Sequence, residues 1–239
     1  MGPGTVCKTY DSNASLGPST RGMKPRSHTD SWLVATLIIL SAGSSVPAQT
    51  IDPPRQESKL PASPFAVAVT IDDQYVFVSL GAAKGIAIAK QGRISAGLAG
   101  VLTTGGGTTG LAITADGKYL LDAVRIGEKS TTPEGLQIID IQEAVHGQAG
   151  AIVRTIPIGD GAGVAEVGLS DDNYFAFVSN EFNDTVSVIE LKKALASGES
   201  TSSIVGKIPV EKSPVGLAFS SDGRHLYVTC ARPSKDGTS

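Results

Sequence analysis

Residues 213–230 read SPVGLAFSSDGRHLYVTC, and closely similar segments recur elsewhere in the chain. The other copies are PFAVAVTIDDQYVFVS from Pro64, TGLAITADGKYLLDA from Thr109 and VAEVGLSDDNYFAFVS from Val164. Each copy has an apolar run, an acidic turn typical of a β-hairpin, and a second apolar run. The turns lie at spacings of 44, 56 and 50 residues, at Asp72, Asp116, Asp172 and Asp222. A period of this size predicts a repeat architecture.

Two further apolar runs complete each of the first three repeats. The third strands are expected around 85–88, 136–139 and 185–189. The fourth strands are expected around 151–156 and 203–208, with a weaker one near Gly100 in the first repeat. Single helical turns are expected at 142–147 and 192–198. Four antiparallel strands per repeat indicate a β-propeller blade, whose apolar faces are buried by stacking on its neighbours. A β-sandwich, the competing all-β fold, does not explain the repeat. The sequence therefore predicts an all-β propeller arc with blades at about 64–108, 109–162, 163–212 and 213–232.

The repeat resembles the YVTN β-propeller family. The runs that carry the resemblance are Ser213–Gly223 with Leu226–Cys230, and Phe177–Asn180 with Asp184–Ile189. The second keeps the family's Asn at Asn180, whereas the first has Cys230 there. The resemblance covers about 64–232 and implies a propeller related to seven-bladed lactonase-like proteins. Because one fold hosts many functions, it does not settle activity.

The chain is short for such a ring. Seven blades of about 50 residues need roughly 350 residues, whereas this chain has 239. We expect three complete blades and a two-stranded partial fourth, a fragment of a probable seven-bladed ring. Open blade edges and uncovered apolar faces favour aggregation or pairing with another copy.

Composition excludes several classes of protein. Apolar residues make up 41% and charged residues 18%, with 28 Gly, 13 Pro and a net charge of −3. These values do not suit a helical bundle or a disordered chain. The absence of a basic run argues against nucleic-acid partners.

The N-terminal region has the pattern of a signal peptide. Basic residues precede the apolar run 32–40, and small residues precede a cleavage point after Ala48. We predict a leader over 1–48, with Met23 as an alternative start, and a linker over 49–63. The alternative for the apolar run is a buried helix. Cleavage would remove Cys7, leave Cys230 as a single thiol, and give a secreted or periplasmic protein with no membrane span.

Glu166 stands out on the innermost strands, which line the channel. The equivalent positions hold residues with almost no side chain, Ala66, Gly110 and Gly216. A carboxylate there is a candidate general base or cation ligand, or else a structural ion-pair partner. The catalytic residues are otherwise unknown, and Glu166 is the candidate that the sequence offers, on this one observation.

Asp122 is the second anomaly. Val occupies the equivalent position in the other repeats, at Val78, Val178 and Val228. Because a buried unpaired charge is costly, we expect a partner, with Arg125 and Arg154 as candidates.

No other motif carries chemistry. The acidic turns have no EF-hand spacing, and His28, His146 and His225 have no metal-ligand spacing. The Gly-rich run 105–110 precedes an expected strand, so we interpret it as an inter-blade turn rather than a phosphate site. No G-x-S-x-G elbow is present. We therefore expect no cofactor and no metal.

Two functions follow as hypotheses. The first is a secreted, non-catalytic scaffold that binds a small molecule or protein on the propeller face. The second is a lactonase-like hydrolase. Lactonase relatives place basic and His side chains on the innermost strands, whereas this chain has pairs such as Thr109-Gly110 and Val215-Gly216, so only Glu166 offers a polar group there.

Overall fold

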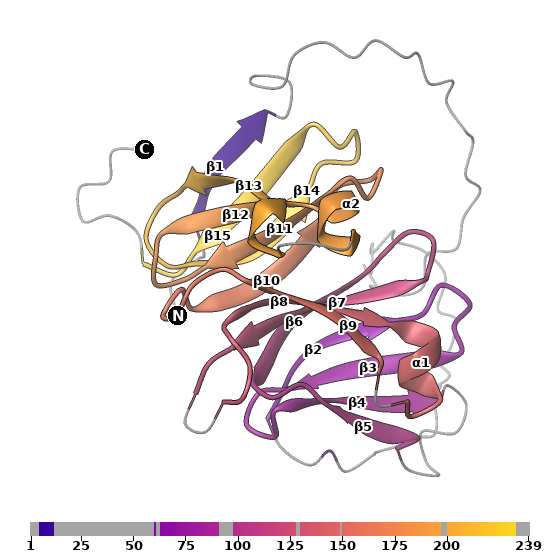
Figure 1. Ribbon diagram of the computed structural model, residues 1–239. Helices are drawn as coiled ribbons and strands as arrows, with labels where there is room; N and C mark the ends of the chain where they lie inside the picture. The colour runs from indigo at the N-terminus through magenta and orange to yellow at the C-terminus, as the bar shows by residue number, and fades with distance from the viewer. Residues whose placement is uncertain are drawn as a thin grey trace, which may run out of the picture.

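The computed structural model describes residues 5–11, 60, 63–90, 98–127, 130–148, 150–196 and 200–232. These residues form four antiparallel sheets that stack side by side (Figure 1). The first sheet consists of β2 (Pro64–Val69), β3 (Tyr75–Leu80), β4 (Gly85–Lys90) and β5 (Gly100–Thr103). The second consists of β6 (Gly107–Ile113), β7 (Tyr119–Arg125), β8 (Gly135–Asp140) and β9 (Ile152–Pro157). The third consists of β10 (Val164–Leu169), β11 (Phe175–Asn180), β12 (Thr185–Glu190) and β13 (Ile204–Pro209).

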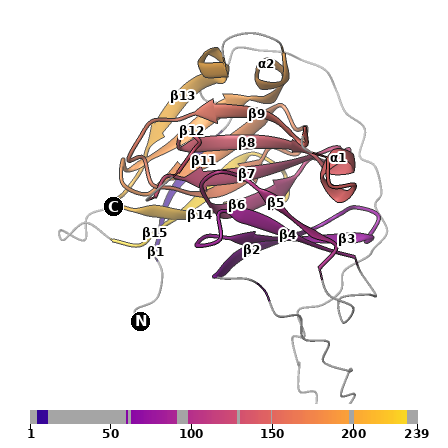
Figure 2. The same cartoon turned by 60° about the horizontal axis from the view of Figure 1, so that its bottom comes forward.

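The fourth sheet contains β14 (Pro214–Phe219), β15 (His225–Cys230) and β1 (Thr5–Asp11), with β15 in the centre. The innermost strands β2, β6, β10 and β14 follow one another along the arc. Figure 1 labels all four, and Figure 2 shows β2, β6 and β14 from another side. The described strands form an arc that does not close into a ring. The predicted propeller arc is therefore confirmed.

Short helices lie where the sequence places helical turns, between the third and fourth strands of a blade. They are α1 (Ile141–Val145) and α2 (Leu191–Leu195), and a 3-10 helix, η2 (Ser200–Ser203), precedes β13. Asp140 caps α1 by accepting a hydrogen bond from the Glu143 N–H at 3.1 Å. The described residues contain no helix with the length and apolar character that a membrane crossing requires.

The acidic turns have one geometry in all four blades. In the second blade Asp116 Oδ1 accepts hydrogen bonds from the Thr114 hydroxyl at 2.6 Å and the Lys118 N–H at 3.0 Å. The same pair of bonds recurs at Asp72, Asp172 and Asp222. The residue after each Asp has a positive φ, which Gly117 and Gly223 adopt without strain. The interpretation of these carboxylates as turn residues agrees with these bonds.

The core lies between the blades. One apolar cluster joins the first and second blades around Phe77, Ile86 and Leu120. A larger one joins the second and third around Leu121 and Val178, and a third joins the third and fourth. Successive residues of a strand therefore face opposite neighbours, so each sheet is apolar on both sides.

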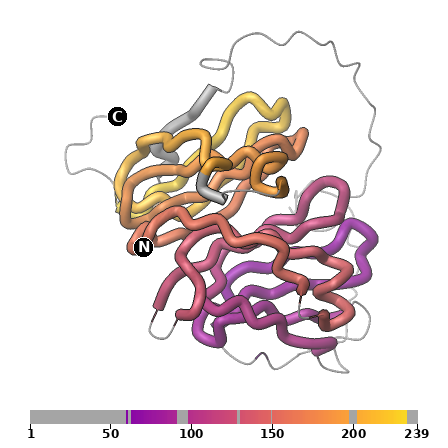
Figure 3. The backbone as a smooth tube through the Cα atoms, viewed as in Figure 1, coloured from indigo at the N-terminus to yellow at the C-terminus, as the bar shows by residue number. Residues whose placement is uncertain are grey.

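The fourth sheet differs from the two-stranded unit that the sequence predicts. The backbone of β1 pairs antiparallel with β15, so the edge of β15 is not open. Figure 1 shows β1, in indigo, beside the sheet of β14 and β15, and the smooth tube in Figure 3 shows the blades following one another from purple to yellow. No local sequence signal announces the pairing, because its two strands come from opposite ends of the chain.

Cys230 is disulfide-bonded in the uncleaved chain, so the single thiol that the sequence predicts concerns only the protein from which the leader has been removed. The other cysteine of the chain, Cys7, belongs to β1. The predicted leader would include β1, so its removal would also remove this strand. Its apolar run 32–40, the cleavage point after Ala48 and His28 lie outside the described residues.

The turn between the first two blades is shorter than the Gly-rich run 105–110 that was predicted to form it. β5 ends at Thr103 and β6 begins at Gly107, so only the first part of the run connects the two blades. Gly105 has a positive φ of 81° there, whereas Gly110 lies within β6.

Candidate functional site on the innermost strands

A register shift marks the position of Glu166 and its equivalents. The pairing of β10 with β11 shifts between Val164 and Val167, and the first two blades shift at the equivalent place. The Glu166 N–H donates to Ser179 Oγ at 3.0 Å, and the Ala66 N–H donates to Ser79 Oγ at 2.7 Å. The backbone is therefore the same in these blades, and only the side chain at Glu166 is unusual. Such bulges re-aim side chains and are frequent near active sites.

The carboxylate of Glu166 lies in a crowded gap between the second and third blades. A Cβ added at Gly110 would lie 2.6 Å from Glu166 Cα and 2.8 Å from its Oε1. Gly110 thus leaves the space that the Glu166 side chain occupies. Glu166 is half-buried, and its Oε1 accepts a hydrogen bond from the Val167 N–H at 3.2 Å.

Glu166 has the electrostatics of a proton acceptor rather than of an ion-pair partner. Burial raises the pKa of Glu166, and the hydrogen bond from the Val167 N–H lowers it again in part. Within the described residues no Lys, Arg or His forms a salt bridge with it. A half-buried carboxyl with a raised pKa can accept or donate a proton, provided a substrate reaches it.

Asp122 lies on the face of the second blade that packs against the first. It pairs in register with Leu111 on β6 and with Gln137 on β8. The side chain is fully buried, and neither carboxylate oxygen has a hydrogen-bond partner. Burial raises the pKa of Asp122 well above its ordinary value. Because directly opposite residues share a face, Gln137 is its polar neighbour across the strands.

Gln137 has a matching deficit. Its amide nitrogen donates to Thr104 O at 3.0 Å and to Thr132 Oγ1 at 3.3 Å, whereas its Oε1 has no partner. A protonated Asp122 offers the donor that this oxygen lacks. The sequence analysis did not single out Gln137. The signal that could have found it is its place directly opposite Asp122, the acid in a column otherwise made of Val.

The predicted partners of Asp122 face the wrong way. Arg125 is three residues along the same strand and so lies on the opposite face of the sheet. It binds Glu181 at 2.5 Å and donates to Gly163 O and Val164 O in the third blade. Arg154 pairs in register with Ile138, on that same opposite face, and donates to Ala196 O at 3.0 Å. The expectation of an ion pair for Asp122 is wrong, because strand alternation separates these charges.

A second buried carboxylate, Glu134, escaped the sequence analysis. It is 1% exposed and accepts hydrogen bonds from the Gly161 N–H at 2.8 Å and the Val164 N–H at 3.0 Å. It thereby fixes the connection from the second blade to β10, the strand that carries Glu166. One sequence feature could have indicated this role: Glu134 directly precedes the third strand of its blade, as Asp184 does in the next blade. Asp184 accepts the Ser213 N–H at 2.9 Å in the same way.

Neither histidine of the described blades joins a metal site. His146 Nδ1 lies 2.7 Å from Gln142 O, and His225 packs beside Tyr227. No group of three or more His, Cys, Asp or Glu side chains suitable for a metal occurs in the described ranges.

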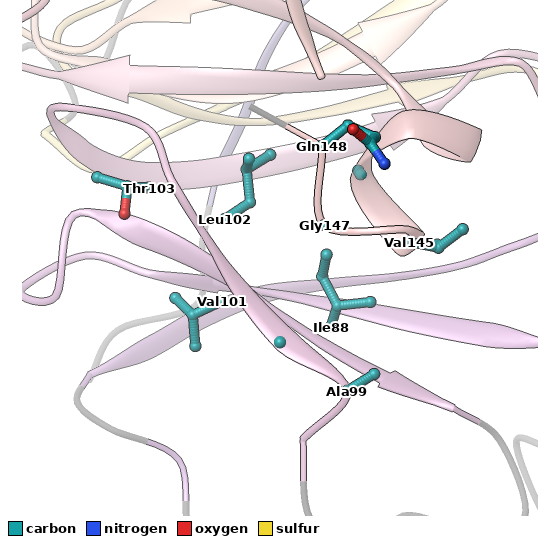
Figure 4. A pocket seen from close by; sticks show the side chains of 10 residues that line it. Ile88, Ala99, Val101, Leu102, Thr103, Val145, Gly147 and Gln148 are labelled. Carbon is teal, nitrogen blue, oxygen red and sulfur yellow. The ribbon is translucent and has the colours of Figure 1, made fainter. Parts of the chain in front are cut away.

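A pocket of about 320 Å³ lies away from these residues, beside the outer strand of the first blade. Figure 4 shows Ile88, Val101 and Leu102 on one side, and Val145 of α1 with Gln148, which follows the helix, on the other. It has no charged side chain in its lining. It is therefore not a candidate for proton-transfer chemistry.

The comparisons with known proteins show the fold. No protein-family model matches the sequence, and no curated protein matches it. Among solved structures, the periplasmic gluconolactonase PpgL of Pseudomonas aeruginosa matches with a TM-score of 0.54 and 16% identity, over 69% of this chain and 49% of that one. Hydrazine synthase of Kuenenia stuttgartiensis matches with a TM-score of 0.53 and 13% identity, over 68% and 54%.

A third match is a candidate 6-phosphogluconolactonase of Bacteroides uniformis, with a TM-score of 0.54 and 15% identity, over 70% of this chain and 47% of that one. The chain thus spans about half of the length of these solved structures. At such identities the matches establish a β-propeller fold and leave activity open.

Proposed function

We propose that this chain is an exported, YVTN-type propeller that binds a small molecule or a protein on its ring face and has no catalytic activity of its own. The observation that carries the proposal is the innermost column, where three of four positions hold Ala or Gly. The remaining one, Glu166, lies against Gly110 instead of projecting freely. One carboxylate without a second polar group does not provide the acid, base and oxyanion donors of a hydrolase.

A lactonase-like activity is the second candidate. Its support is the gluconolactonase among the similar structures and the raised pKa of Glu166. Because the chain spans about half of that protein, further catalytic groups would have to come from other blades.

One assay separates the two functions. Purified protein is incubated with a panel of sugar lactones, beside the variants Glu166→Gln and Glu143→Gln. The control residue Glu143 is an exposed glutamate on α1. We expect hydrolysis no faster than in buffer for all three proteins. Hydrolysis that Glu166→Gln abolishes and Glu143→Gln retains would overturn the scaffold and establish the hydrolase.

Export is tested separately. We propose that the leader is removed after Ala48 and that the mature protein is secreted or periplasmic. The mature fourth blade then keeps β14 and β15 and lacks β1 and Cys7. N-terminal sequencing of protein recovered from the periplasm or the medium should begin at or near Gln49. A mature protein that retains Trp32 would contradict the proposed leader.

A further inference from the structure

Within the part of the chain that the structure describes, nothing covers one apolar face of the first blade. On β2, Phe65, Val67 and Val69 are 69%, 63% and 45% exposed. The alternate residues Ala66 and Ala68 pack toward the second blade. The exposed side chains therefore all point away from the described arc.

The equivalent face is buried in the other blades. Val67 pairs with Val78 as Leu111 pairs with Asp122 and Val167 with Val178. Leu111 is 8% exposed and Val167 is 5% exposed, because each packs against the preceding blade. The face of Phe65, Val67 and Val69, which we call the acceptor face, thus has the shape and chemistry that receive another blade.

The fourth blade has the complementary face. Tyr227 is 37% exposed, and Ala218 and Thr229 on the same side of the sheet are also exposed. Their equivalents Phe177 and Ser179 in the third blade are buried at 7% and 0%. We call Ala218, Tyr227 and Thr229 the donor face. Its pattern of Ala, aromatic residue and hydroxyl matches Ala68, Phe77 and Ser79 of the first blade.

The contact between third and fourth blades shows how two such faces meet. Phe177 packs edge-to-face on Phe219, with ring centroids 5.3 Å apart. A Cβ added at Gly168, the equivalent of Ala218, would lie 3.5 Å from Leu217 Cβ. By the same register Tyr227 would meet the position of Val69, and Ala218 that of Val67.

We propose that the acceptor face binds the donor face of a second copy of this chain. Both halves of the repeated interface are present on one chain, and a copy supplies a matching surface for each. The described residues form four sheets, so two copies would contribute eight blades to a ring, one more than the seven that the sequence resemblance implies. Each contact joins two different faces and is therefore heterologous. Two such contacts close a ring of two copies when each arc spans half a circle. The proposal does not depend on the ligand-binding function.

The test measures the mass of the full chain by sedimentation velocity over a concentration series. The variants are Val67→Glu on the acceptor face and Tyr227→Glu on the donor face, with Val205→Glu as the matched control. Val205 is 45% exposed on β13, outside both faces. We expect a dimer that both face variants weaken at least tenfold and that the control leaves unchanged. Thermal melts establish that each variant is folded.

Mixing supplies a second arm. The Val67→Glu and Tyr227→Glu variants each self-associate at least tenfold more weakly than the wild type, but a pair made of one copy of each keeps one contact between two unchanged faces. The mixture should therefore form a heterodimer. The proposal would be overturned if the wild-type protein stays monomeric at all concentrations. The acceptor face would then have another occupant, either residues 12–59 or a different protein. A dimer equally sensitive to Val67→Glu and Val205→Glu, or a mixture that stays monomeric, would overturn the proposal as well.

Discussion

The second blade buries two carboxylates, Glu134 and Asp122, which differ in the hydrogen-bond donors around them. Glu134, at the junction with the third blade, accepts two backbone N–H groups. Asp122, facing the first blade, accepts none. The first retains the hydrogen bonds that it would make in water, whereas the second loses them. Burial alone therefore does not assign a role to an acid: the donors around it decide whether it stabilises the fold or strains it.

The largest effect should come from Glu134→Ala. The change leaves the Gly161 and Val164 N–H groups without acceptors at a buried site. We expect a loss of about 3 kcal/mol in the free energy of unfolding, measured by urea titration. Glu134→Gln, which keeps one acceptor, should lose less, and the exposed Glu143→Ala should change little. An unchanged midpoint for Glu134→Ala would remove the contrast between the two acids.

Asp122→Val should have the opposite sign. It restores the residue found at Val78 and Val178, and it removes a buried acid that has no partner. We expect a gain of about 1–3 kcal/mol at neutral pH, measured by the same titration. The exposed Asp160→Val is the control. A loss of stability would indicate that a hydrogen bond from a protonated Asp122 to Gln137 forms and outweighs the cost of burial.

The pH dependence of stability sharpens the comparison further. Burial raises the pKa of Asp122 in the folded state, so the folded protein holds this proton more tightly than the unfolded chain. Its favourable contribution is complete below the ordinary carboxyl pKa and is lost as pH rises toward the folded value. The slope for one proton is at most about 1.4 kcal/mol per pH unit. Asp122→Asn should lack it, and parallel curves for wild type and variant would contradict this.

The smallest effect is expected at an acidic turn. Hydrogen bonds from Thr114 and then from the Lys118 N–H lower the pKa of Asp116. Its contribution is present at neutral pH and is lost as pH falls through the folded value, which is the reverse of Asp122. Because the carboxylate is exposed, Asp116→Ala should lose less than about 1 kcal/mol. The measurement is the melting temperature at pH 7 and below pH 3, where the difference should vanish; a difference unchanged at low pH would contradict it.

Local patterns predicted most of the fold. Strand alternation, Asp turns and the repeat located the blades, the helical turns and the unusual positions of Glu166 and Asp122. Contacts between distant residues were beyond those patterns. The donors to Glu134 lie 27 and 30 residues away in sequence. Arg125 was a plausible partner for Asp122 by proximity along the chain, but the two side chains of one strand face different blades. The β1–β15 pairing joins segments with no common signal.

The pairing of β1 with β15 has a consequence for the order of folding. The first three blades contain only strands that follow one another along the chain, so each can form as soon as it is synthesised. As long as the leader is attached, the fourth sheet also joins β1 to β15, which lie far apart in the sequence. The entropy of closing so long a loop slows the formation of this pairing. The propeller arc should therefore assemble from blade to blade, and the pairing of β1 with β15 should form last.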